Sequence, residues 1–545
     1  MKLRKLSIKN FKNLRDFEID FGKVPFTTVV LGQNGTGKSN LLEALIIIFG
    51  ELDLGEPPTF AYELSYECRE REISITADPA LPRRDQVKIT VGDANGLVLE
   101  NISYRRFAQD PTRTYLPSYV FGYYSGPSNR MEKHFDKHQE RFYRDLLSGE
   151  ERPLRPLLYA RPEHSQFALL SFFTEDEANV PEGELSMREF LDRLLGIEEL
   201  ISVMFVLREP PWRSREGDPR FWHARGVVRQ LLARIYERST LPIRESVRIT
   251  AEFANKKTLE HLYLYLRNRD QLQGLANQYD SPQEFFKALE STYISKILSE
   301  VRIQLRRRNA DGSLTFRDLS EGEQQLLMVL GLLRFTKEHE ALFLLDEPDT
   351  HLNPAWGVQY LDLMRQVVGE QPTSHVILTT HNPLVIASLK REDVRIMQRE
   401  RGRADRERES VRAVLPDEDP QGMGVAAILT SDLFGLRSTL DQPTQDDLDK
   451  RRRLAFSDKE LSQEEESELN RLNQQLANLD FSITVRDPLY QSFASEYREF
   501  VREFTRRAAP DLKEGIVFTP EQRQRQRELT RQILRELKAQ RGQRI

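Results

Sequence analysis

The chain has 545 residues, of which 30% are charged and 39% hydrophobic, and its formal net charge is -5. This length predicts two or three lobes around more than one core, and the charge excludes a surface that is basic throughout, so any contact with nucleic acid has to come from a local patch. Cys68 is the sole cysteine, which excludes a disulfide framework and a cysteine-ligated metal cluster.

The sequence carries no sign of a membrane segment. No run of about 18 apolar residues occurs, and residues 1–8 lack the apolar core of a signal peptide. We therefore expect a cytoplasmic protein without a membrane partner domain of its own.

The first predicted elements lead to a phosphate-binding loop. Alternation over residues 1–31 predicts short strands, of which the apolar run Thr27–Leu31 is the last. A Gly-rich turn follows, and Asn40–Phe49 is an apolar, helix-compatible run. Strand, GxxxxGK[ST] and helix in this order form a loop whose backbone N–H groups surround phosphate oxygens at the positive end of a helix.

This loop predicts ATP and Mg²⁺ as cofactors. Lys38 is expected to reach the β- and γ-phosphates and to act in catalysis, and the Ser39 hydroxyl is expected to ligate magnesium. We assign nucleotide binding to six residues of the segment: Asn34, Gly35, Gly37, Lys38, Ser39 and Asn40. The alternative is a Gly-rich turn with a chance lysine, which the flanking strand and helix disfavour.

A β lobe is expected after the loop helix. Three strand-like segments predict an antiparallel sheet that is layered onto the nucleotide core: Glu72–Ala77, Gln86–Val91 and Leu97–Tyr104. A turn at 93–96 joins the last two. A further buried strand is expected at Ser118–Tyr124, before a turn at Gly126.

From 131 to 311 the pattern becomes helical and charge-rich, which predicts a large, mainly helical insertion without the sustained heptads of a coiled-coil arm. Helices are expected over Met187–Leu195, Gly226–Arg238 and Pro282–Arg308. Within it, Arg208–Arg238 combines eight arginines with four aromatic residues, which could bind phosphate and stack bases. An amphipathic helix with a solvated face, next to a Pro/Trp loop, is the favoured interpretation.

The α/β pattern resumes at 312. The segment Ser320–Glu323 is, by itself, an S-x-x-E capping box before an apolar helix.

The strand Ala341–Leu345 ends in Asp346-Glu347, where Asp346 would hold magnesium opposite Ser39 and Glu347 would deprotonate the attacking water. Two helix-capping acids are the alternative. Strands that alternate with helices predict a parallel or mixed sheet.

Taken together, these motifs resemble the ABC-type ATPases of the SMC/RecF/Rad50 kind, and especially the AAA-labelled group that includes the overcoming-lysogenization-defect proteins. The resemblance covers residues 1–50, including the opening Leu3–Leu14, and residues 312–395. It implies an α/β fold: an ABC-type P-loop ATPase head with an antiparallel β lobe, the helical insertion and a helical C-terminal region.

The same resemblance implies a homodimer, or a higher homo-oligomer, that sandwiches ATP between heads. Ser320 and Gly322 of the signature segment would then complete the nucleotide site of another subunit. His381 would be the switch histidine that contacts the γ-phosphate, and Asp349 would bind nucleotide from the loop at the dimer interface. One departure concerns the family's glutamine loop: no glutamine stands near Ser125-Gly126, and Gln139 and Gln166 lie farther on.

The expected domains are 1–130, 131–311, 312–397 and a charged, partner-docking helical region at 398–545. In the last, 399–412 is expected to be a solvated loop, 446–479 helical, and 521–544 a basic tail. Gly422–Asp441 resembles a segment of the ATPases of Septu anti-phage systems. This resemblance implies a sensor or regulatory subunit that controls a separately encoded HNH nuclease.

Other functions remain open. One is a DNA repair or recombination ATPase, and another is a self-contained nuclease. For the latter, Asp417-Glu418-Asp419 could supply half of a Toprim metal site, although an acid cluster in a linker is the favoured interpretation. A transporter ATPase is disfavoured, because the insertion between Ser39 and Ser320 is far longer than such a subunit carries.

Overall fold

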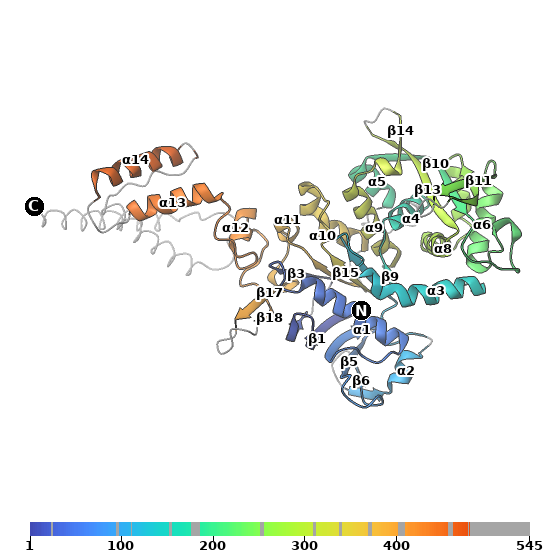
Figure 1. Cartoon of the computed structure of the whole chain (residues 1–545), viewed down its shortest axis with the longest axis horizontal. Coiled ribbons are helices and arrows are strands. Elements are labelled where there is room, and N and C mark those ends of the chain that lie inside the picture. Colours follow the sequence, from blue (N-terminus) through green and yellow to red (C-terminus); the bar gives the residue numbers. More distant parts are fainter. Residues whose placement is uncertain are drawn as a thin grey trace, which may run out of the picture. The chain divides into compact units, whose positions relative to one another are not determined.

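The computed structural model describes residues 1–479 apart from 23–25, 94–97, 111, 152–154, 176–185, 251–255, 309–311, 337–339, 369–372, 402–408, 456–460 and 478. The chain divides into two units, Met1–Arg437 and Ser438–Ile545 (Figure 1). Most of the turn expected at 93–96 and the whole basic tail at 521–544 lie outside the described residues.

A seven-stranded sheet forms the centre of the first unit. Its order is β18-β17-β3-β16-β15-β8-β9, and every neighbouring pair is parallel except β17 with β18. The strands are β3 (Thr27–Gly32), β8 (Tyr119–Tyr124), β9 (Leu157–Tyr159), β15 (Ala341–Asp346), β16 (His375–Thr379), β17 (Val394–Arg401) and β18 (Glu409–Val414). The mixed α/β sheet expected from the sequence is confirmed.

Both faces of this sheet are covered, which explains why its central strands are apolar at nearly every position. Alternate residues of β15 enter different cores: Leu342 and Leu344 join one cluster, Phe343 and Leu345 the other. Helix α1 (Lys38–Leu54) covers the first face. The second face packs with α9 (Glu321–Thr336) and α10 (Pro354–Val368).

The β lobe is a six-stranded antiparallel sheet of order β2-β1-β4-β5-β6-β7. Its strands are β1 (Lys2–Phe11), β2 (Leu14–Asp20), β4 (Tyr62–Cys68), β5 (Arg71–Ala77), β6 (Val87–Asp93) and β7 (Val98–Ile102), followed by helix α2 (Tyr104–Ala108). The three strands expected between 72 and 104 are confirmed. The N-terminal strands belong to the same sheet, since β1 pairs with both β2 and β4.

The insertion contains more strand than the sequence analysis expected. A five-stranded antiparallel sheet of order β11-β12-β10-β13-β14 stands among its helices. The strands are β10 (Ile197–Arg208), β11 (Ile243–Thr250), β12 (Lys256–Leu266), β13 (Leu298–Arg307) and β14 (Ser313–Thr315). The helices are α3 (Asp136–Ser148), α4 (Glu163–Phe172), α5 (Met187–Leu195), α6 (Gly226–Arg238), α7 (Arg269–Ala276) and α8 (Pro282–Ile294). The insertion is therefore a mixed α/β lobe.

Two of the three helices expected there are confirmed with their bounds, α5 and α6. The third was wrong in its second half, because the span Pro282–Arg308 holds α8 and then β13. Val301, Ile303 and Leu305 are buried at every second position between exposed polar residues. This period of two is that of a strand with one buried face.

The head also extends beyond the expected boundary at 397. Val394–Met397 pair with β3, and β17 pairs with β18 over Ile396–Arg401. The charge-rich segment expected to be a loop therefore supplies two strands of the central sheet, while 402–408 lie outside the described residues. Three short helices complete this unit: α11 (Pro383–Ile386), α12 (Val425–Thr430) and the 3-10 turn Arg391–Asp393.

The described part of the second unit is a helical hairpin of α13 (Gln442–Ala455) and α14 (Gln463–Ala477). Leu448, Leu469, Leu472 and Leu476 are buried in it. Lys450 forms an ion pair with Glu468 at 2.6 Å. Of the helical stretch expected over 446–479, the parts within Gln442–Ala455 and Gln463–Ala477 are confirmed. Among the helices that the structure describes, none is long and apolar enough to cross a membrane.

Candidate nucleotide site

Three strands of the central sheet end together at one edge. β16 lies between β3 and β15 and is parallel to both, with Thr379 opposite Val30 on one side and Asp346 on the other. The phosphate loop, Asp346-Glu347 and the turn that carries His381 therefore leave the sheet at its carboxyl edge, where parallel α/β sheets bind ligands. Segments more than 300 residues apart in the sequence meet there.

The phosphate loop has the backbone that an anion site requires. Gly37, the residue before α1, has a φ of 100°, which an L side chain rarely adopts. No side chain caps the N-terminus of α1, and its first turn holds no acidic residue. The loop thus offers uncapped helix N–H groups and a positive dipole end to a phosphate.

Lys38 lies inside this loop. Its Nζ donates a hydrogen bond to the Gly32 carbonyl oxygen at 2.7 Å, and the residue is buried. Burial lowers the pKa of Lys38, and the nearby carboxylates of Glu347 and Asp346 oppose that shift. The amine is therefore placed between the loop and the two acids, as the motif predicted.

A set of side chains that the sequence analysis did not assign braces the loop from the β lobe. Asn13, in the turn between β1 and β2, donates to the Gly35 carbonyl at 3.1 Å. Asn40 donates to Asn13 and accepts a hydrogen bond from Arg130. Both polar ends of Asn40 are engaged in this way, so in this structure Asn40 braces the loop rather than facing a nucleotide.

Glu43, one turn into α1, holds the same braces together. Its carboxylate is buried and meets Lys12, Arg130 at 2.9 Å and His134 at 2.9 Å. Burial alone would raise the pKa of Glu43, but the hydrogen bonds from these three groups outweigh it and bring the pKa to about 2. An ionised Glu43 therefore ties the segment around Arg130 to the loop helix.

Asp346 fits a divalent cation. Its carboxyl is buried, Oδ1 accepts a hydrogen bond from the Thr379 hydroxyl, and Oδ2 is buried without a hydrogen-bond partner among the described residues. Burial raises the pKa of Asp346, against the neighbouring hydroxyls of Ser39 and Thr379. A buried carboxylate oxygen without a partner, beside a serine hydroxyl, is the set of hard oxygen ligands that Mg²⁺ takes.

Glu347 adopts an unusual backbone conformation, with a φ of 53°. Its N–H donates to the carbonyl and the hydroxyl oxygen of Thr379, both at 3.1 Å. The Glu347 side chain is 32% exposed and lies 3.2 Å from His381 Nδ1. The structure thus brings together Lys38, Ser39, Asp346, Glu347 and His381, five of the residues predicted for catalysis or metal binding.

The signature segment forms a different set of contacts. Ser320 Oγ accepts from the Glu323 N–H, and Glu323 accepts from the Ser320 N–H at 2.7 Å, which is the capping box predicted from the residues alone. A methyl group at Gly322 would lie 2.4 Å from the His351 carbonyl oxygen. None of the contacts that the structure describes for Ser320 and Gly322 is with the phosphate loop of the same chain.

Asp349 and the region around Ser125 lie close to this assembly. Asp349 is buried, and its carboxyl accepts a hydrogen bond from the Thr380 hydroxyl at 2.9 Å, which holds the turn before His381. The Ser125 N–H donates to the Asp346 carbonyl at 3.2 Å. The segment after β8 therefore reaches the site, as expected of the glutamine loop, and the polar side chain it sends to the loop helix is Arg130.

The segment proposed as a nucleic-acid patch, Arg208–Arg238, uses its aromatic residues internally. Trp212 donates to the Ser295 carbonyl at 2.7 Å, and Trp222 donates to Glu260 at 2.9 Å. Phe221 is fully buried. Phe221 therefore cannot stack on a base, and the half-buried Trp212 and Trp222 are held by hydrogen bonds within the lobe, which favours the structural interpretation.

The acid cluster at 417–419 also has local partners. Asp419 accepts a hydrogen bond from the Arg391 N–H at 2.8 Å, and the Asp417 N–H donates to Asp432 at 3.0 Å. These contacts join the cluster to the turn before β17. They describe a structural role for the segment.

Two family models match the chain. Residues 1–100 match the AAA ATPase domain, and residues 213–387 match the AAA domain described as putative AbiEii toxin, Type IV TA system. The first match covers the phosphate loop, and the second covers the signature segment, Asp346-Glu347 and His381.

Among characterised relatives, the Septu protein PtuA of Bacillus mycoides is 25% identical over 223 residues, which are 39% of this chain and 30% of that protein. The DNA replication and repair protein RecF of Lactococcus lactis is 47% identical over 45 residues, 8% of this chain and 12% of RecF. The chain thus spans less than a third of the length of each. The SMC head domain from Thermotoga maritima aligns over 76% of this chain and 99% of its own, with 14% identity and a TM-score of 0.30.

Proposed function

Because the chain is an ATPase of the SMC and RecF-like class, we propose that it acts as the sensor or regulatory subunit of a bacterial anti-phage defence system. In this role, ATP binding and hydrolysis control a separately encoded HNH-type nuclease. The alignment with the Septu protein PtuA is the observation that carries this proposal.

Within the site, each residue has a role that follows from its position. The loop N–H groups and Lys38 hold the phosphates, and Lys38 balances their charge. Glu347 accepts a proton from the attacking water, and His381, which lies 3.2 Å from it, contacts the γ-phosphate. Ser39 and Asp346 would hold Mg²⁺, which neutralises charge on the β- and γ-phosphate oxygens when it is bound.

We further propose that two heads share each ATP. The signature residues Ser320 and Gly322 lie at the start of α9 and have no described contact with the phosphate loop of their own chain. A second copy, related by two-fold symmetry, would bring its signature helix to the γ-phosphate. ATP would close such a dimer and hydrolysis would open it.

A phage-challenge experiment tests the defence role. The proposal requires an HNH nuclease gene beside the gene of this chain, and the two would be expressed together or singly in a phage-sensitive bacterium, with plaques counted. We expect protection only from the pair, with loss of protection in Lys38→Ala. Glu18→Gln, on an exposed part of β2, is the matched control. Full protection by the chain alone, or none by the pair, would contradict the proposal.

A repair function is the second candidate, and the short RecF alignment favours it. It predicts that DNA ends or gapped duplexes stimulate ATP hydrolysis by the purified chain several-fold without a nuclease partner. The regulatory proposal predicts that the partner nuclease, rather than naked DNA, changes the rate. Comparing the rate with each addition separates the two functions.

A further inference from the structure

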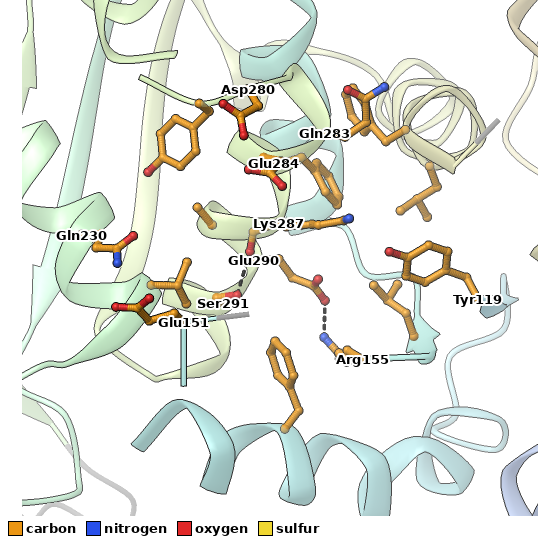
Figure 2. A pocket seen from close by; sticks show the side chains of 18 of the residues that line it. Tyr119, Glu151, Arg155, Gln230, Asp280, Gln283, Glu284, Lys287, Glu290 and Ser291 are labelled. Carbon is orange, nitrogen blue, oxygen red and sulfur yellow. Dashed lines mark hydrogen bonds and ion pairs between the residues drawn. The ribbon is translucent and has the colours of Figure 1, made fainter. Parts of the chain in front are cut away.

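A cavity of about 460 Å³ opens in the first unit, away from the nucleotide site (Figure 2). This volume lies in the range of pockets that hold small organic molecules. Its walls come from β8, α3, α6, α8 and α9, so that it lies where the insertion meets the central sheet and the signature helix. No residue assigned above to ATP or magnesium lines it.

A buried arginine stands at one end of this cavity. The side chain of Arg155 is 4% exposed, and its Nη1 pairs with the buried carboxylate of Glu290, as the dashed line in Figure 2 marks. Its Nε and Nη2 are buried without a hydrogen-bond partner among the described residues. Burial of unpaired donors is costly, so their partner is expected to be a ligand or water.

The two free nitrogens have a defined geometry. Nε and Nη2 lie on the same edge of the guanidinium plane, while Nη1, which holds Glu290, points away from that edge. Two parallel N–H donors match the two oxygens of a carboxylate or phosphate and bind them in a bidentate manner. Glu290 thus orients the arginine, and the Nε and Nη2 edge stays buried without a described hydrogen-bond partner.

Part of the cavity wall is aromatic, and the remainder carries polar and charged side chains, among them Glu151, Gln230 and Lys287. Phe142 lies 5.6 Å below the Arg155 guanidinium, and Phe286 packs on Phe335 with ring centroids 5.0 Å apart. The charged residues Asp280 and Glu284 are exposed at the opposite end (Figure 2). The oxyanion of a ligand would therefore enter deep, against Arg155, with its ring between aromatic walls.

We propose that this cavity binds a small organic oxyanion, a carboxylate or a phosphate on an aromatic or similarly apolar body, and that its occupancy regulates ATP hydrolysis. The binding half of the proposal rests on the cavity alone. The regulatory half rests on the ATPase activity of the proposed function and on the two elements that join the cavity to the nucleotide site.

Those two elements are β8 and α9. Phe121 of β8 lines the cavity and stacks on Phe343 of β15, the strand that ends at Asp346, with centroids 4.6 Å apart. Phe335 lines the cavity from α9, whose first turn follows Ser320. A ligand that holds both aromatic rings would change how freely the signature helix moves against the catalytic strand.

Fluorine NMR of the full chain tests the binding half. The probes are 4-fluorobenzoate and 4-fluorophenyl phosphate, with 4-fluorobenzyl alcohol as the probe without an oxyanion. Saturating ADP and magnesium fill the phosphate loop. We expect line broadening with one or both oxyanions, and affinity for the alcohol that is at least about ten-fold weaker, as loss of a charge-assisted pair implies. The two oxyanion probes separate carboxylate from phosphate ligands.

Val227→Trp fills the cavity from α6 and keeps both members of the Arg155–Glu290 pair in the chain, and Val358→Trp on the exposed face of α10 is its matched control. The double variant Arg155→Gln with Glu290→Gln removes both buried charges together. Binding should be lost in Val227→Trp and in the double variant, and kept in Val358→Trp. Failure of every probe to bind the parent chain, or binding that survives in Val227→Trp, would overturn the proposal.

The regulatory half is measured separately as phosphate release. A bound probe should change the hydrolysis rate of the parent chain at least about two-fold and leave Val227→Trp unaffected. Binding with an unchanged rate would refute the regulatory role alone. An inactive chain that still binds the probe would point to the ATPase assignment instead, so the two failures are distinguishable.

Discussion

Glu347 carries a conformational cost that its neighbours sustain. A non-glycine residue at a φ of 53° costs about 1–3 kcal/mol. Two hydrogen bonds from its N–H to Thr379 hold it there, and Thr379 also donates to Asp346. One threonine therefore positions both acids, and the strained residue is the one assigned to activate water.

Glu347→Gln is expected to lower ATP hydrolysis by at least about 100-fold, because the amide cannot accept the proton of the attacking water. ATP binding should be retained, since the phosphate loop is untouched. Single-turnover hydrolysis and equilibrium binding of ATP measure the two effects, with Glu18→Gln as the control. Full turnover in Glu347→Gln would remove the assigned base.

Gly322→Ala is expected to destabilise the signature segment by about 1–3 kcal/mol and to reduce hydrolysis, because the new methyl group would meet the His351 carbonyl at 2.4 Å. Gly50→Ala, inside α1, is the matched control, since its nearest neighbours lie at ordinary contact distances of 3.5 and 3.6 Å. Calorimetric melting and phosphate release are the measurements. Equal behaviour of the two variants would show that the contact with His351 is not close.

Single residues differ in how far sequence alone predicts them. Lys38 and Asp346 stand in local motifs whose neighbours specify a strand end and a turn, so their positions at the site could be predicted. Asn13 and Arg130 could not, because each reaches the loop helix through a contact between distant segments. The sequence holds one indication: no glutamine stands near Ser125, so a different side chain has to contact the loop helix from that segment.

At the scale of elements, α1 holds two buried carboxyl groups whose environments differ. Glu43 meets three basic side chains, and its pKa is about 2. Glu51, two turns later, is 8% exposed, and its carboxyl accepts a hydrogen bond from the Thr59 N–H at 3.3 Å. Burial raises its pKa to about 7. The first half of the helix is thus anchored by charge, and the second half by a carboxyl group that favours its neutral form.

Glu51→Gln is expected to stabilise the protein at about pH 8 and to have little effect at about pH 4.5. The pKa of Glu51 in the folded state, about 7, lies above its ordinary value of 4.5. Between these two pH values the folded state keeps the proton, whereas the unfolded state loses it. In the parent chain, the contribution of Glu51 to the free energy of unfolding is therefore most favourable at low pH, and it falls as the pH rises to about 7. The gain in the variant is up to about 3 kcal/mol.

The measurement is the difference in melting temperature between Glu51→Gln and the parent at each pH, so that other titrating groups cancel. Glu18→Gln, at an exposed residue of β2 that pairs with Lys5, serves as the control and should show no such trend. A difference that is constant with pH would mean that folding does not raise the pKa of Glu51.

Elements of the head could be predicted better than those of the insertion. β3, β15 and β16 are short apolar runs that end in recognisable motifs, which fixes their type and direction. β13 has the period of a strand, yet its charged residues at alternate positions also suit a solvated helix, and only its partner β10 decides between them. β17 was missed because its parallel pairing with β3 joins segments that lie far apart in the sequence.

At the scale of the whole molecule, the nucleotide site has two halves. Lys38, Asp346 and Glu347 meet at one edge of the sheet, whereas Ser320 and Gly322 engage Glu323 and His351. If each ATP lies between two heads, a defect in one half can be compensated by a second copy whose other half is intact. A site that is complete within one chain offers no such rescue.

Mixing two inactive variants tests this directly. Lys38→Ala damages the phosphate-loop half, and Ser320→Arg damages the signature half at a cost of about 1 kcal/mol in lost capping. In an equimolar mixture, half of the dimers contain one intact site, so we expect about a quarter of parent activity from independent sites. Lys38→Ala mixed with Glu347→Gln is the matched control: both changes lie in the same half, so no intact site forms and no activity should return. Phosphate release that stays at background in both mixtures would mean that hydrolysis does not use a signature segment from a second copy.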